Sequence, residues 1–226
     1  MSARLLATLC LVFGSVPAIS APSAGSADNT LVVYLKTGTQ QQTAPVDEMK
    51  REVGVLMAQA GYQVEWRSVG SQSGDSSDAA MLAVLELNGA CGIAPGYRAT
   101  EAPQVSTKSL ATTAVSDGQV LPFSQLNCTA LTRSVSAALA QTAGAQRDFL
   151  YGRAMARVVA HELYHVLMRT TEHARGGVAR SCFTTADLLT ERFEFEGATL
   201  ASLRTRLEPA PPVESSEIAD DAAVRQ

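Results

Sequence analysis

Positive charge is scarce and scattered in this sequence. Its 226 residues contain 18 Lys and Arg against 22 Asp and Glu, a net charge of −4, and no cluster of basic residues. Proteins that bind nucleic acid neutralise phosphates with Lys and Arg, so we expect no nucleic-acid partner. Hydrophobic residues nevertheless make up 46% of the chain. That proportion can bury a core, which argues against a disordered protein.

Long apolar runs are also missing, apart from one at the N-terminus. Arg4 precedes the apolar stretch 5–16, Pro17 ends it, and residues 18–20 supply the small side chains of a cleavage site. These features are typical of a secretory signal peptide over 1–20, with a buried N-terminal helix as the alternative. We therefore predict an exported protein, periplasmic or secreted, with no membrane association after removal of the signal.

Only four cysteines occur, and Cys10 lies inside the signal-like segment. Disulfides form readily in exported proteins, and three remaining cysteines allow one pair with one left over. We favour the pair Cys91–Cys128, because both residues lie near the edges of strand-like segments, and we expect Cys182 to be free. The alternative is that all three are small buried hydrophobic residues.

Strand-like and helix-like patterns occupy residues 31–206, which we interpret as a single α+β domain. Strand patterns occur at 31–35, 62–66, 81–87, 110–115 and 119–123, and helical signals occur at 45–60, from Asn127 or Thr129 to 140, at 145–169, and from Thr184 or Thr185 to 192. The first strands and helix predict a parallel βαβ unit, and Asp117-Gly118 predicts a hairpin. We expect residues 21–30 to be a flexible lead-in and 207–226 a disordered acidic tail.

The long predicted helix carries the sequence His161-Glu162-Leu163-Tyr164-His165. Two His four residues apart lie one turn above each other on nearly the same helix face, so their rings can bind one metal ion. In this motif Glu162 acts as a general base on metal-bound water. We predict Zn²⁺, which prefers imidazole and lowers the pKa of bound water to about 7. Another divalent metal is the alternative.

A third ligand is available nearby, because all three His of the chain lie within 161–173. A catalytic zinc needs three protein ligands and one open position. We predict that His173 is the third, since a chain that leaves the helix near 168–171 and turns back can point it at the same ion. Cys182 is an alternative thiolate ligand.

The order of His161, Glu162, His165 and His173 resembles the metzincin clan of zinc peptidases, which carry HExxH, a turn, a third His and then a Met-turn. The resemblance implies these three His as zinc ligands and Glu162 as the base for hydrolysis of a peptide bond. It also implies a zincin-like fold of the small secreted bacterial type. Such a fold has a twisted mixed sheet with a backing helix, a long helix carrying HExxH and a short C-terminal helical lobe.

The sequence departs from that clan in the turn. Seven residues, 166–172, separate the second His from the third, where metzincins have five. Met168 replaces the usual Gly, and Ala179 stands where the Met of the Met-turn is expected. A gluzincin-type site is the runner-up, because its third ligand is a Glu on a later helix and Glu191 has a usable spacing.

The sequence therefore predicts a monomeric zinc peptidase, an endopeptidase with a peptide or protein substrate. An inactive zinc-binding exported protein and a metal-free interaction domain are the alternatives. Substrate could pair with the sheet edge near 111–115, unless this hairpin only closes the sheet.

Six further side chains near the motif can be given expected roles. Asp187 or Glu191 could orient the ligating rings. Tyr164 is expected in the core. Arg153, Arg157 and Arg169 lie on the helical line through the two His and are expected to cover the helix surface.

Overall fold

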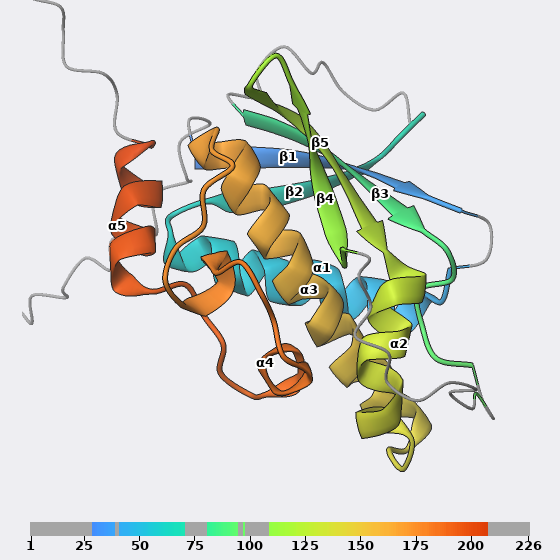
Figure 1. Ribbon diagram of the computed structural model, residues 1–226. Helices are drawn as coiled ribbons and strands as arrows, with labels where there is room; N and C mark the ends of the chain where they lie inside the picture. Colours follow the sequence, from blue (N-terminus) through green and yellow to red (C-terminus); the bar gives the residue numbers. More distant parts are fainter. Residues whose placement is uncertain (1–28, 39–40, 71–80, 95–96, 98–108, 208–226) are drawn as a thin grey trace, which may run out of the picture.

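The computed structural model describes residues 29–38, 41–70, 81–94, 97 and 109–207. Within them the protein has an α+β fold, in which five strands form one mixed sheet and helices pack against it (Figure 1). The signal peptide expected over 1–20 lies outside the described residues, as do nearly all of the lead-in and of the acidic tail. None of the described helices combines the length and the apolar character that a membrane span requires.

The strands of the sheet are β1 (Thr30–Thr37), β2 (Gln63–Ser68), β3 (Met81–Asn88), β4 (Ala111–Ser116) and β5 (Gln119–Asn127). Their order across the sheet is β2-β1-β3-β5-β4. Of these five, only β4 runs antiparallel to its neighbour. The five strands, the parallel βαβ start and the β4–β5 hairpin are confirmed. Because β4 is the last strand in the order, its outer edge is not paired with another strand of the described sheet.

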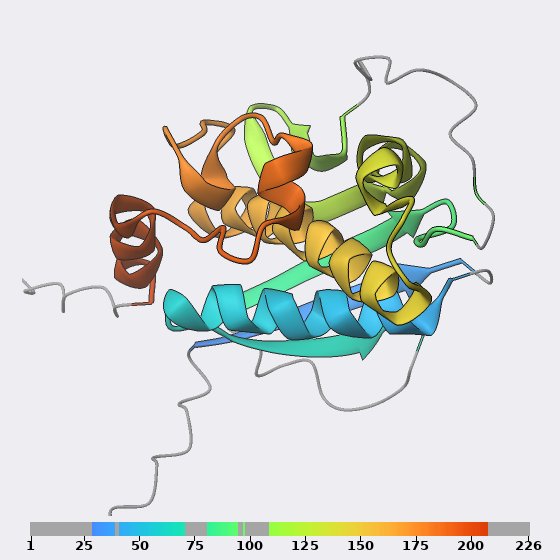
Figure 2. The same cartoon turned by 90° about the horizontal axis from the view of Figure 1, so that it is seen from below.

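One face of the sheet is apolar and packs against two helices. Alternate residues of a strand share a face, so Leu31, Val33 and Leu35 of β1 enter the core together with Leu85 and Leu87 of β3. The helices α1 (Thr43–Gln59) and α3 (Gly144–Met168) run side by side against this face (Figure 2). Helix α3 lies against the β5 and β4 end of the sheet, and α1 lies toward β2.

Helix α2 (Cys128–Leu139) begins directly where β5 ends. The side chain of Asn127 accepts a hydrogen bond from the Ala130 N–H at 3.0 Å, which satisfies one of the free donors of the first turn. The predicted disulfide Cys91–Cys128 is confirmed and joins this helix to the segment after β3. Cys182 is free and exposed, as expected.

The chain after α3 forms a 3-10 turn, η3 (Gly177–Ala179), and two short helices, α4 (Thr185–Leu189) and α5 (Gly197–Thr205). Thr184 and Asp187 form a reciprocal capping box at the start of α4. Helix α4 ends before residue 192, so Glu191 lies beyond the helix on which it was expected. Helix α5 was not expected, because no side chain caps its start.

Arg157 corrects one expectation about the surface of α3. Its side chain is fully buried rather than spread over the helix. The guanidinium donates hydrogen bonds to the backbone carbonyls of Asp187 and Thr190, and burial lowers the pKa of Arg157 to about 10. Arg169 is exposed. Arg157 therefore fastens the segment after η3 to the middle of α3.

Candidate metal centre

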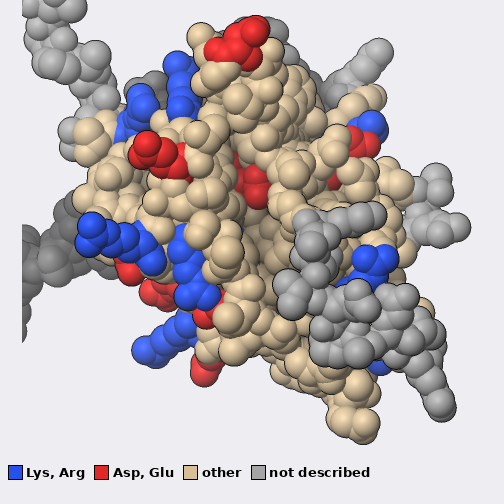
Figure 3. All heavy atoms as spheres, in the orientation of Figure 1, with Lys and Arg blue, Asp and Glu red and all other residues tan. Residues whose placement is uncertain are grey.

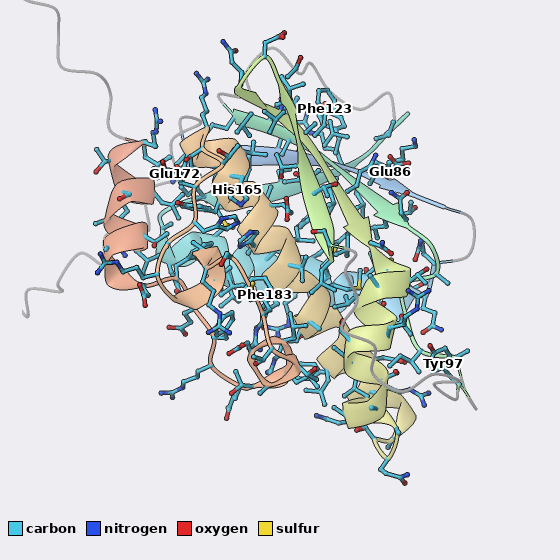
Figure 4. All side chains as sticks on the ribbon, viewed as in Figure 1. Glu86, Tyr97, Phe123, His165, Glu172 and Phe183 are labelled. Carbon is cyan, nitrogen blue, oxygen red and sulfur yellow. A yellow bond between two sulfur atoms is a disulfide. The ribbon has the colours of Figure 1, made fainter. Side chains whose placement is uncertain are left out.

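Helix α3 and the loop that follows it bring the three His of the chain together. One ring nitrogen from each of His161, His165 and His173 lies within 4.8 Å of the others. The centroids of the rings are 4.7 to 5.1 Å apart. Figure 4 shows His165 on α3, with Glu172 and Phe183 on the chain that passes the same side of the helix. The three predicted ligands are therefore close enough to bind one metal ion.

Backbone carbonyls fix the two His of the helix. The Nδ1 atom of His161 lies 2.8 Å from the Val178 carbonyl oxygen, and Nδ1 of His165 lies 2.7 Å from that of Thr170. A carbonyl only accepts, so each Nδ1 carries the hydrogen and each neutral ring keeps a lone pair on Nε2. The expectation that Asp187 or Glu191 orients these rings is wrong for His161 and His165, because backbone carbonyls take both bonds.

The two Nε2 atoms of His161 and His165 face each other at 3.0 Å. Two lone pairs at this distance repel unless a cation lies between them. Two nitrogens bound to zinc at about 2.0–2.1 Å with a tetrahedral angle lie about 3.3 Å apart, close to the separation observed. The donor set therefore fits a divalent cation that takes imidazole ligands.

The end of α3 explains how His165 is held. Arg169 adopts the left-handed conformation at φ 50°, which normally favours Gly, and ends the helix. The Thr170 N–H then donates to the His165 carbonyl at 3.2 Å. The same turn aims the Thr170 carbonyl at the ring of His165. The turn that ends α3 is therefore also the turn that orients His165.

The position of His161 depends on a glycine in the loop. Gly177 has φ +61°, and a Cβ there would lie 2.4 Å from the Glu194 carbonyl oxygen. The next residue, Val178, donates its N–H to the same carbonyl at 3.0 Å and offers its own carbonyl to His161. Only Gly satisfies both the conformation and the close approach.

The base of the site is apolar. Ala179, at the position where the clan would have Met, is fully buried. The ring of Phe183 packs edge-on against His161, with the centroids 5.3 Å apart, and against Phe193 at 5.6 Å. Sequence reasoning missed Phe183, because nothing in its local pattern marks it as a neighbour of the ligands.

Glu162 lies beside the His cluster and is 6% exposed. Its Oε2 accepts a hydrogen bond from Thr113 Oγ1 of β4 at 2.6 Å, and Thr113 Oγ1 lies 2.9 Å from Ser124 Oγ of β5. Burial raises the pKa of Glu162, and the hydrogen bond from Thr113 opposes that shift. Both hydroxyl residues were missed in the sequence, because their proximity to Glu162 arises only from packing.

A groove of ≈ 360 Å³ opens over these residues. Besides Glu162 and the three His, the described residues that line it are neutral and mostly small: Ser109, Ala111, Thr112, Thr113, Val115, Val120, Thr170, Thr171 and Ser181. A neighbouring groove of ≈ 410 Å³ shares three of them and adds amide side chains. Figure 3 accordingly shows a largely uncharged surface in the middle of this face.

The alternative ligands stand apart from the cluster. Glu191 is exposed beyond α4, and Cys182 is exposed before it. Neither belongs to the metal-binding group found among the described residues. The structure thus gathers His173, and not these two residues, with His161 and His165.

Comparison of the chain with protein-family models and with curated proteins found no match. Function therefore has to be inferred from the residues of the site. Those residues form a three-His cluster with a buried carboxylate beside it, and the cluster opens into a groove. Three ligands leave a tetrahedral ion with one position for water or substrate.

Proposed function

We propose that the protein is an exported zinc peptidase in which His161, His165 and His173 bind the metal and Glu162 is the general base. The observation that carries the proposal is the pair of Nε2 atoms facing each other at 3.0 Å beside a buried carboxylate. When bound, zinc would polarise a peptide carbonyl and lower the pKa of a water molecule to about 7.

The buried His are prepared to act as neutral ligands. Burial lowers the pKa of His161 to about 4 and lowers that of His165 as well. Metal binding requires deprotonated imidazole, so near pH 7 no proton needs to leave these two rings. The hydrogen bonds on Nδ1 already fix the tautomer in which Nε2 is available.

Glu162 is placed to move protons. Its side chain lines the groove together with the three His. As a carboxylate it would accept a proton from the attacking water and pass it to the leaving amine. Burial raises the pKa of Glu162, which brings its basicity closer to neutral pH and so favours this role.

The edge strand beside the site favours an extended peptide as substrate. Four residues of β4 line the groove, and the outer edge of β4 has no strand beside it in the described sheet. An extended chain could add there through backbone hydrogen bonds, which is compatible with endopeptidase activity. The mixed sheet, its antiparallel edge strand and the long helix α3 are also compatible with the zincin-like fold that the sequence resembles.

Export is part of the proposal. The disulfide Cys91–Cys128 is of a kind that persists in oxidising compartments, and the first 20 residues have the pattern of a signal peptide. We propose a monomer in the periplasm or outside the cell that acts on peptides or proteins.

The test combines metal content with peptide hydrolysis on purified mature protein. We expect one zinc per chain and cleavage of a broad peptide mixture. Glu162→Gln should keep zinc and lose cleavage, and His165→Ala should lose zinc. Glu191→Gln is the matched control, because this exposed carboxylate lies outside the cluster.

Each contrary result points to a different alternative. Loss of zinc in Glu191→Gln, with retention in His173→Ala, would support the gluzincin-type site instead. Stoichiometric zinc with no cleavage would support an inactive zinc-binding protein. A chain that binds no divalent metal would refute the proposal.

A further inference from the structure

We infer that Thr113 is a positioning residue whose hydroxyl holds the Glu162 carboxylate and links it to the strand on which substrate would dock. The inference rests on the proposed peptidase function. Its basis is the contact of 2.6 Å between Thr113 Oγ1 and Glu162 Oε2, which crosses from β4 to α3. Nothing else in the described structure hydrogen-bonds to this carboxylate.

The direction of the hydrogen bonds follows from the groups involved. An ionised carboxylate only accepts, so the Thr113 hydroxyl must donate to Glu162. The oxygen of Thr113 is then free to accept from Ser124, which lies opposite it on β5 at 2.9 Å. Ser124 is buried, so water does not compete with this bond. The two hydroxyls form a directed chain that ends on Glu162 Oε2.

The hydrogen bond from Thr113 gives the two oxygens of the Glu162 carboxylate different roles. Oε2 is held by Thr113, whereas Oε1 has no hydrogen-bond partner among the described residues. The side chain lines the groove, so Oε1 is the oxygen left for proton transfer. A Glu side chain has several rotatable bonds, and an unheld carboxylate would spread over many positions. Catalytic groups must be held close to one geometry to be effective.

Thr113 also lies at an irregular point of β4. The register between β4 and β5 shifts between Thr113 and Val115. Such irregularities bend a strand and redirect its side chains, and they are common beside active sites. A peptide paired with the outer edge of β4 would therefore lie along the strand whose Thr113 hydroxyl holds the general base.

The test uses four variants of the zinc-loaded protein, at Thr113, Ser116 and Ser124. Thr113→Val keeps the shape of the side chain and removes its hydroxyl, whereas Thr113→Ser restores the hydroxyl. Ser116→Ala is the control. This hydroxyl lies on the same strand but is exposed, and it donates its hydrogen bond to the neighbouring Asp117. For each variant we would measure zinc content, kcat and KM on one peptide, and a crystal structure.

We expect Thr113→Val to keep its zinc and its KM while kcat falls about 10- to 100-fold, with the Glu162 carboxylate displaced. Thr113→Ser should recover kcat to within a few fold, and Ser116→Ala should match the wild type. Ser124→Ala should lower kcat by a smaller factor. A purely structural role would instead raise KM or reduce zinc content.

The positioning role and the peptidase function can fail separately. An unchanged kcat in Thr113→Val, a rise in KM alone, or loss of zinc would overturn the positioning role. If the wild type binds zinc and cleaves nothing, the peptidase proposal fails. In that case the crystal structures still decide the geometry: an unmoved carboxylate in Thr113→Val overturns the inference, and a displaced one supports it.

Discussion

The burial of His161 predicts that the metal-free protein loses stability as pH falls from about 6.5 to about 4. Burial lowers the pKa of this residue from 6.5 to about 4 in the folded protein. Between these pH values the unfolded chain binds a proton that the folded chain does not. The contribution of His161 to the free energy of unfolding is therefore complete above pH 6.5 and declines below it. A shift of this size corresponds to about 3 kcal/mol. The pKa of His165 is lowered too, so its contribution has the same sign.

Urea unfolding in the presence of a chelator, from pH 4 to pH 7.5, measures this loss. The comparison is between the wild type and His161→Gln, whose amide can still donate to the Val178 carbonyl but does not titrate. We expect the pH dependence in this window to be weaker in the variant by about 3 kcal/mol. Glu162, whose pKa is raised, acts in the opposite direction in both proteins. Equal slopes for the two proteins would refute the assignment of the effect to His161.

Three further predictions concern contacts that hold the site in place. Replacing buried Arg157 by Met removes its hydrogen bonds to two backbone carbonyls and should lower the free energy of unfolding by about 2–5 kcal/mol; an unchanged urea midpoint would contradict this. Replacing Cys91 and Cys128 together by Ala opens a loop with a sequence separation of 37 and should cost about 3–4 kcal/mol, which thermal unfolding with and without reductant can check. Gly177→Ala should weaken zinc binding in a competition titration and destabilise the fold by more than about 1 kcal/mol. Gly118→Ala is the control: Gly118 also has positive φ, but open space surrounds it, so zinc affinity should be unchanged.

The parts of the fold that sequence predicted well are those with local causes. The spacing of His161 and His165 places both rings on one helix face whatever surrounds the helix. Asn127 and Thr184 mark helix starts, because their side chains satisfy the free N–H groups of the first turn. Asp117-Gly118 marks the hairpin for a similar reason, since both residues have positive φ in the structure.

The parts that sequence missed depend on tertiary contacts. Thr113 is one of many Thr in strand-like segments, and only the packing of β4 on α3 brings its hydroxyl to Glu162. Arg157 has the helical spacing of a surface residue, but α4 and the residue after it cover its guanidinium. Helix α5 has no capping side chain, and its Leu203 is buried in the core, where its carbonyl accepts from the Tyr62 hydroxyl at 2.9 Å as well as from a backbone N–H.

The unusual length of the segment between His165 and His173 does not prevent the three rings from meeting. A clan spacing describes one way to turn the chain, whereas a metal site requires only that the donor atoms converge. Here the turn is made by Arg169 in a left-handed conformation, and the Ala174 N–H closes the loop on the Ala179 carbonyl at 2.9 Å. The same loop supplies the carbonyls that orient both His of the helix. Thr170, which orients His165, lies inside this segment, so shortening the segment should disturb His165 as well as His173.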